Sequence, residues 1–287
     1  MRSEQEMFDI IVNTAKENKH IRAVYLNGSR ANPNVQKDKY QDFDIVYVAD
    51  DSAPPFNNKQ WISGFGDIAL LQEPDLNDRA WGTEHDFNRS YSWQLLFLDG
   101  NRIDLTICSK QVMLEEYEKD SLTVPLLDKD NCLPPIPKAN DMLYYVQKPT
   151  ESQYMDVTNN YWWCLQNVAK GIVRDQLTYA MNMYIQVVHE KLETMVAWYI
   201  GINTGFSVSV CVWGKYFKKY LPDYIYSMYT NTYSDSNYNN LWEAIFTACK
   251  LFRTIAPFVG SHFGFVYNQQ EDCNMMDYLT KMKNGLL

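Results

Sequence analysis

The sequence lacks the residue patterns that mark several large classes of protein. Its six cysteines lie far apart without a Cys-x-x-Cys pair, and its four histidines are scattered, so a zinc site built from these side chains is not expected. Basic residues are outnumbered, with 26 Lys and Arg against 35 Asp and Glu and a net charge of −9. Proteins that bind nucleic acid usually carry a basic surface. The composition therefore disfavours a nucleic-acid partner and favours a cationic small molecule.

Long apolar runs, internal repeats and low-complexity segments are also missing. No stretch approaches the roughly 18 apolar residues that indicate a membrane-spanning helix, so no membrane partner is expected. The first residues, Met-Arg-Ser-Glu-Gln-Glu, have no apolar signal-peptide core. We therefore expect a cytoplasmic protein whose thiols are reduced.

Aromatic side chains, in contrast, are abundant and make up 15% of the 287 residues. Apolar residues account for 46% and charged residues for 21%, which is close to the averages of globular proteins. The length suits one large domain or two ordinary ones. Much of the aromatic content lies in the second half, where it predicts a helical core and a lined pocket.

The N-terminal part of the chain has the pattern of mixed helix and strand. Ser3 and Glu6 are spaced as a capping box, and the apolar residues that follow recur at helical spacing, which predicts a helix. Short apolar runs predict strands over 21–27, 42–48, 66–71, 93–98 and 102–107. The last two runs flank Asp99-Gly100, a dipeptide typical of a β-hairpin turn.

A proline-rich segment divides the chain. Pro134, Pro135 and Pro137 cannot continue a helix or a central strand, so we expect one domain over 1–137 and a second over 138–287. Apolar and aromatic residues then recur at helical spacing over 154–173, 176–200, 209–220 and 240–255. The predicted fold class is α+β, with a mixed sheet and flanking helices followed by an α-helical domain.

Three carboxylates form the most informative pattern. Asp42 and Asp44 are two residues apart on a predicted strand, so their side chains share one face. Asp104 lies in the second strand of the hairpin. Carboxylates that converge repel one another, and a hard cation such as magnesium, which prefers oxygen ligands, removes that repulsion. The alternative is that they are solvated acids on the face of a strand.

The residues before this pair favour a phosphate site. Gly28-Ser29 ends the preceding strand, and such a turn lets backbone N–H groups and a hydroxyl approach phosphate oxygens closely. Arg30 could add a bidentate contact, although a surface ion pair is the alternative. Phosphate contacts on one side and metal-binding acids on the other are the components of in-line displacement at phosphorus.

This ordered pattern resembles that of the nucleotidyltransferase superfamily, and more closely that of the aminoglycoside 6-adenylyltransferase family. The resemblance extends over almost the full chain, and the block around Asp104 is its most specific part. The segments that carry it include Gly28-Ser-Arg30, Gln41-Asp-Phe-Asp-Ile45, Leu98-Asp-Gly-Asn-Arg-Ile-Asp-Leu-Thr106, Tyr161-Trp-Trp163, Ala169-Lys-Gly171 and Ala197-Trp-Tyr199.

The resemblance implies a nucleotidyltransferase domain joined to a helical domain, ATP as donor, magnesium as cofactor and pyrophosphate as product. It implies that Asp42 and Asp44 bind magnesium. Asp104 would bind a second metal or act as general base on the acceptor hydroxyl, and these two roles can merge. Gly28, Ser29 and Arg30 would contact the triphosphate.

Further candidates follow from side-chain chemistry. Lys170 and Lys215 could neutralise phosphate charge, although solvated lysines are more common. Trp162 and Trp163 could stack on adenine or on the acceptor, but adjacent residues on a helix face different ways, so at most one is expected to do so. Glu84 and Asp156, with Asp86 and Asp175, are candidate contacts for a cationic substrate; each could equally be a solvated surface acid.

The activity expected from the resemblance is AMP transfer from ATP to a hydroxyl of an aminoglycoside, with streptomycin as the acceptor and antibiotic resistance as the outcome. Residues 73–88 depart from the family pattern and lie between predicted strands, where an acceptor-binding loop could lie. Two alternatives stay open: a nucleotidyltransferase with another small-molecule, tRNA or protein acceptor, and a non-catalytic nucleotide-binding module. The sequence does not distinguish a monomer from a dimer.

Overall fold

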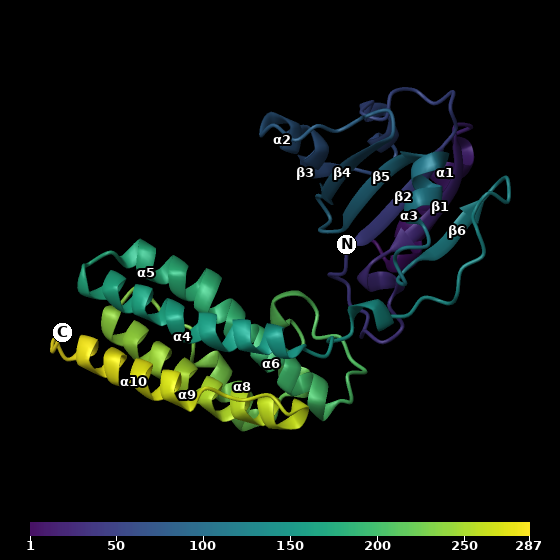
Figure 1. Cartoon of the computed structure of the whole chain (residues 1–287). Coiled ribbons are helices and arrows are strands. Elements are labelled where there is room, and N and C mark those ends of the chain that lie inside the picture. The colour runs from purple at the N-terminus through teal and green to yellow at the C-terminus, as the bar shows by residue number, and fades with distance from the viewer. The chain divides into compact units, whose positions relative to one another are not determined.

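A computed structural model describes the whole chain, residues 1–287, as two compact units. The first unit comprises Met1–Leu143 and the second Tyr144–Leu287. Figure 1 shows a sheet with helices in the first unit and helices alone in the second. The α+β class is therefore confirmed. The division falls shortly after the proline-rich segment, and the roles assigned to 1–137 and 138–287 remain predictions.

The first unit is built on one six-stranded sheet with the order β3-β4-β5-β2-β1-β6 (Figure 1). Its strands are β1 (Ile21–Asn27), β2 (Phe43–Ala49), β3 (Ile68–Gln72), β4 (Ser90–Phe97), β5 (Arg102–Ser109) and β6 (Val124–Asp128). The predicted hairpin is confirmed, because β4 and β5 pair as antiparallel neighbours. The central pair, β2 and β5, is parallel, and these are the strands that carry the predicted acids.

Helix α1 (Glu4–Glu17) covers one face of the sheet. Its predicted capping box is present, with Ser3 and Glu6 each accepting a hydrogen bond from the other's backbone. Its buried side chains, Met7, Ile11 and Ala15, pack with alternate residues of the strands in one apolar cluster. Burial of this face contributes about 25 cal/mol for each Å² of apolar surface removed from water. It fixes the register of β2, since a slip of one residue would turn every side chain to the opposite face.

The opposite face is covered only in part. Helix α3 (Lys110–Glu116) follows β5 directly, and its Met113 packs with Tyr25, Val48 and Cys108 in a smaller apolar cluster. Val48 and Cys108 lie toward the ends of β2 and β5, whereas the acids lie at the starts of these strands. Part of the same sheet face is therefore left for polar side chains beside the acids.

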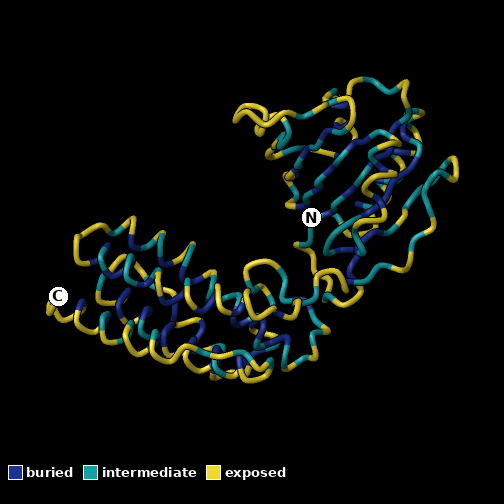
Figure 2. The backbone as a smooth tube through the Cα atoms, viewed as in Figure 1, coloured by how far each residue is buried: buried dark blue, intermediate teal, exposed yellow.

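The second unit is helical. Its elements are α4 (Glu151–Val173), α5 (Leu177–Met183), a π-helical turn (Tyr184–Val188), α6 (His189–Asn203), α7 (Phe217–Tyr220), α8 (Asp223–Thr230), α9 (Tyr238–Phe263) and α10 (Gln269–Lys283). Aromatic packing is prominent in its core, where Tyr161 stacks on Phe252 with ring centroids 3.8 Å apart. Figure 2 shows buried positions recurring along these helices. No helix of the chain has both the length and the apolar character needed to cross a bilayer.

One predicted helix, over 209–220, is largely wrong. Only α7 at its end is α-helical. Cys211 and Trp213 have φ values of +59° and +52°, in the left-handed region that interrupts a right-handed helix. The spacing of aromatic residues suggested a helix there, but Trp213 is exposed rather than packed. Periodicity alone did not reveal the change of backbone conformation.

Candidate active site

The parallel pairing of β2 and β5 places two of the predicted acids side by side. Asp44 is the register partner of Asp104, and neighbouring strands lie about 4.8 Å apart. Asp42 immediately precedes β2 and is two residues from Asp44, so it lies on the same face of the chain. The three carboxylates therefore meet at the starts of the two central strands.

Amide side chains extend this acidic position into a row across the sheet. Asn27 on β1 pairs with Asp44, and on the other side Gln94 on β4 pairs with Asp104. Gln72 on β3 pairs in turn with Gln94. Laterally paired residues of a sheet share a face, so this row is polar across five strands. The two glutamines were not predicted as site residues, and only the register identifies them.

Gly28 is required by the close approach of Asp44. Its φ is +73°, and a Cβ added at this position would lie 2.3 Å from Oδ2 of Asp44. Glycine therefore does two things here: it takes a backbone conformation that other residues rarely adopt, and it leaves space for the carboxylate. Ser29, predicted as a triphosphate contact, begins a single 3-10 turn after it and is half-buried.

The electrostatics of the site are unfavourable to ionised carboxylates. Burial, together with the negative charges of Asp104 and Asp42, raises the pKa of Asp44 to about 6. Arg102 opposes this effect. A cation bound beside such a carboxyl stabilises its ionised form. Shifted pKa values of this kind are common at functional sites.

Arg102 is the cation nearest to the acids, and sequence reasoning missed it. Its Nε and Nη2 donate to Oδ1 and Oδ2 of Asp104 at 2.7 and 2.6 Å, and its Nη1 lies 3.4 Å from Oδ2 of Asp42. The hydrogen bonds that Arg102 donates to Asp104 raise the pKa of Arg102 above its ordinary value. A signal was available, since Arg102 is two residues before Asp104 on the same strand and must share its face.

The donor set fits magnesium in its chemistry, because three carboxylates offer only hard oxygen ligands. The geometry is a different matter: no three Asp, Glu, His or Cys side chains of the chain are arranged to hold a metal ion. Two of the acids turn instead toward the guanidinium of Arg102. The assignment of Asp42, Asp44 and Asp104 as metal ligands stays a prediction.

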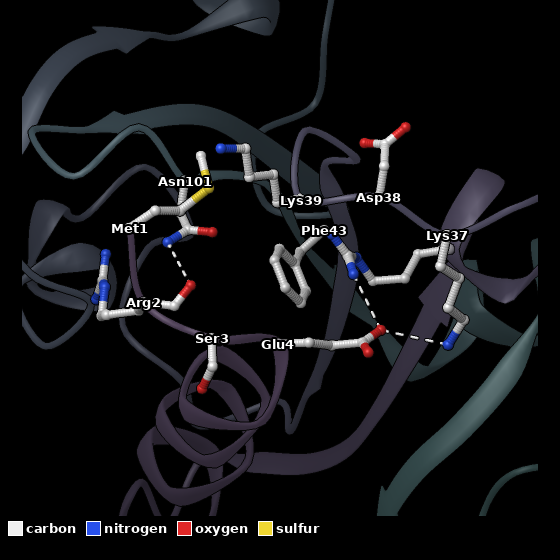
Figure 3. A pocket seen from close by; sticks show the side chains of 10 residues that line it. Met1, Arg2, Ser3, Glu4, Lys37, Asp38, Lys39, Phe43 and Asn101 are labelled. Carbon is white, nitrogen blue, oxygen red and sulfur yellow. Dashed lines mark hydrogen bonds and ion pairs between the residues drawn. The ribbon is translucent and has the colours of Figure 1, made fainter.

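Arg30 donates a hydrogen bond to the protein from each of its three guanidinium nitrogens. Its side chain is buried, and it donates to the backbone carbonyls of Gln41 and Asp42 and to the Glu4 carboxylate. Its guanidinium carbon also lies 3.9 Å from the centre of the Phe43 ring. Glu4 accepts hydrogen bonds from Arg30 and from Lys37. Figure 3 shows Glu4 and Lys37 at the edge of a cavity of about 430 Å³. These contacts hold the backbone of Asp42 in place, and the contact of Arg30 with the triphosphate stays a prediction.

The candidates of the helical unit are divided between a cavity and the surface. Trp162, Trp163 and Lys170 line one cavity of about 520 Å³ between α4 and α10. Trp162 is 3% exposed and Trp163 is 64% exposed, so only Trp163 offers its ring to a ligand. Lys215 lies on the surface, outside that cavity.

The acidic candidates Glu84, Asp86, Asp156 and Asp175 are also distributed widely. Glu84 and Asp86 lie on an exposed loop after α2 (Pro74–Ala80), and Asp86 accepts a hydrogen bond from the backbone of Asn88. Asp156 accepts one from Asn160, and Asp175 accepts one from Tyr238. These bonds are compatible with ordinary surface roles, and their contacts with a substrate stay predictions.

The Gly-Ser turn, the strand acids and the mixed sheet are compatible with a nucleotidyltransferase, and the family match and the relatives show that the chain is an enzyme of that class. The streptomycin adenylyltransferase family matches residues 1–282. Aminoglycoside 6-adenylyltransferases of Campylobacter jejuni and Bacillus subtilis are 33% and 32% identical to the chain, over 99% and 95% of it and 96% and 95% of their own lengths. The chain belongs to the streptomycin adenylyltransferase family. The resemblance inferred from the motifs is therefore confirmed.

The crystal structure of an aminoglycoside 6-adenyltransferase from Bacillus subtilis is 29% identical and aligns over 99% of both chains, with a TM-score of 0.48.

Proposed function

We propose that this enzyme transfers AMP from ATP to a hydroxyl of an aminoglycoside, with streptomycin as the acceptor and pyrophosphate as the second product. The observation that carries the proposal is the pairing of Asp44 with Asp104 beside Asp42 in a chain that matches the family over nearly its whole length. A protein that only bound nucleotide would have no need for three carboxylates that repel one another.

The reaction forms one bond and breaks one. The acceptor oxygen attacks the α-phosphorus of ATP, the bond from that phosphorus to the oxygen bridging to the β-phosphate breaks, and pyrophosphate leaves with the bonding electrons. The proton of the acceptor hydroxyl passes to a base. Asp104, which lies at the edge of the acidic group next to Gln94, would accept that proton or share it while bound to a metal.

Asp42, Asp44 and Asp104 would hold magnesium, which when bound neutralises charge on the phosphates and orients them. The turn at Gly28-Ser29 would offer backbone N–H groups to the triphosphate. Gly28 also leaves space for the Asp44 carboxylate. Arg30 contributes by holding the carbonyls of Gln41 and Asp42, so that Asp42 presents its carboxylate from a fixed backbone.

The acceptor is proposed from charge and from the relatives. A net charge of −9 favours a polycation, and the relatives are named as acting on aminoglycosides. Gln94 and Gln72 continue the row beyond Asp104, where their amides suit the hydroxyls of a sugar-like ring. The acidic segment 73–88 follows β3 directly.

The test is transfer from labelled ATP, with magnesium, to a panel of aminoglycosides, followed by pyrophosphate release and product mass. We expect streptomycin to gain the mass of one adenylyl group and kanamycin-type compounds to stay unmodified. Asp42→Asn should lose at least about a hundredfold in turnover, because the amide lacks the charge that holds a hard dication. Asp51→Asn, a change at an exposed acid, is the matched control and should retain activity.

Each other outcome has a definite meaning. Transfer to kanamycin alone would reject streptomycin as the acceptor. Transfer to no aminoglycoside would favour another acceptor, for which the divergent segment 73–88 would be the first place to look. Near-normal turnover of Asp42→Asn would reject the metal assignment.

A further inference from the structure

The guanidinium of Arg102 occupies the position between two of the acids. It makes a bidentate contact with Asp104 at 2.7 and 2.6 Å and reaches Asp42 at 3.4 Å. Paired N–H···O bonds of this kind fix direction as well as distance. A carboxylate whose two oxygens both face a guanidinium has neither free for a metal in the same geometry.

This contact accounts for a disagreement within the site. The residue types and the strand register favour a metal centre, yet no three ligating side chains are arranged for one. The Arg102 side chain is 38% exposed, so it is not locked into the core. Since Arg102 and Asp104 belong to the same strand, the guanidinium can leave without any change in the sheet.

We propose that Arg102 competes with the divalent cation for Asp42 and Asp104, and thereby makes metal binding depend on the nucleotide. The proposal rests on the proposed function, because it takes these acids to be the metal ligands. Without nucleotide, the guanidinium neutralises part of their charge and a metal must displace it. When a triphosphate is present, its oxygens offer the guanidinium another bidentate partner, and the acids are released to the metal.

Binding of Mn²⁺ in place of magnesium tests this without any turnover. The free Mn²⁺ signal in electron paramagnetic resonance gives the affinity of the protein, with and without a non-hydrolysable ATP analogue and always without acceptor, once the Mn²⁺ that the analogue binds without protein is subtracted. For the wild type we expect weak binding alone and much tighter binding with the analogue. Arg102→Gln should bind Mn²⁺ roughly tenfold or more tightly in the absence of nucleotide, because a competing positive charge is removed. The gain produced by the analogue should shrink correspondingly.

Two further variants make the result specific. Arg89→Gln removes a comparable surface pair, since Arg89 lies 2.6 Å from Glu115, and should leave Mn²⁺ binding unchanged. Arg102→Lys keeps the positive charge but loses the paired donors of the guanidinium, so its affinity for Mn²⁺ should fall between those of the wild type and Arg102→Gln. It also provides the comparison if Arg102→Gln fails to fold, as judged by circular dichroism.

The outcomes separate this inference from the proposed function. Unchanged or weaker nucleotide-free Mn²⁺ binding in Arg102→Gln, with tight binding of the wild type in the presence of the analogue, would overturn the role of Arg102 and leave the metal assignment intact. Absence of Mn²⁺ binding by every variant, even with the analogue, would overturn both. The identity of the acceptor affects neither result.

Discussion

Substitution of Gly28 by alanine tests the most constrained contact of the site. The added Cβ would lie 2.3 Å from Oδ2 and 3.0 Å from Cγ of Asp44, whereas 3.4–4 Å is ordinary contact. The carboxylate must therefore move by about 1 Å or the turn must shift. Because Gly28 has a φ of +73°, the new side chain also meets backbone strain.

The two effects have different magnitudes and different readouts. The backbone of Gly28, with a φ of +73° and a ψ of −154°, lies in a region that is essentially open to glycine alone, and an alanine there costs about 1–3 kcal/mol of folding stability. A displacement of about 1 Å at a reacting group can lower turnover about a hundredfold. We therefore expect Gly28→Ala to fold, with a moderately lowered melting temperature, and to lose most of its activity.

Gly264→Ala separates these contributions. Gly264 ends α9 with a φ of +78° and has no atom within 4 Å of an added Cβ. It should show the stability loss alone, with normal turnover. Thermal unfolding and steady-state adenylyl transfer measure the two quantities on the same preparations. If Gly28→Ala and Gly264→Ala retained equal activity, the close approach of Gly28 and Asp44 would have no functional meaning.

Two further predictions concern the charges of the site. In metal-free buffer, Asp44→Asn should stabilise the protein at pH 8 by up to about 3 kcal/mol but not at pH 4. Burial and the neighbouring acids raise the pKa of the Asp44 carboxyl from 3.8 to about 6. The protonated carboxyl therefore contributes fully to folding stability below pH 3.8, and this contribution is lost as the pH rises through 6. Equal effects in thermal unfolding at both pH values would contradict this. Arg30→Gln should lower the free energy of unfolding by about 2–4 kcal/mol and lower turnover, because Glu4 and the carbonyls of Gln41 and Asp42 lose their donors. A variant that is as stable in denaturant and as active in transfer assays as the wild type would refute the positioning role.

The parts of the fold that sequence could predict are those governed by local rules. Ser3 and Glu6 satisfy the N-terminus of a helix within one turn, and Asp99-Gly100 supplies the turn of the hairpin. Two-residue spacing placed Asp42 and Asp44 on one face in the same way. The side-by-side position of Asp44 and Asp104 depends on strand pairing, so no local rule could provide it.

What sequence could not predict depends on partners distant in the chain or on backbone exceptions. The contact of Arg30 with phosphate stays a prediction. Burial of its side chain against Phe43 and Glu4 could not be predicted, because it arises only when three segments meet. The left-handed residues Cys211 and Trp213 interrupted a stretch whose composition is compatible with a helix. Gln72 and Gln94 became visible only as register partners.

The strand register determines which acids lie together, whereas side-chain contacts determine how their carboxylates are oriented. The acids can therefore be identified although their arrangement around a metal is not seen. The sheet fixes the Cα positions of Asp44 and Asp104 as neighbours, and this holds whatever cation is present. The carboxylates of Asp42 and Asp104 can rotate, and they turn toward the positive charge of the Arg102 guanidinium. In the site that we propose, the fold determines which residues would bind the metal, whereas the cations present determine how their carboxylates are arranged. The strand register identifies the acids of this proposed site, and the inferred competition between Arg102 and the metal ion would set the geometry of their carboxylates.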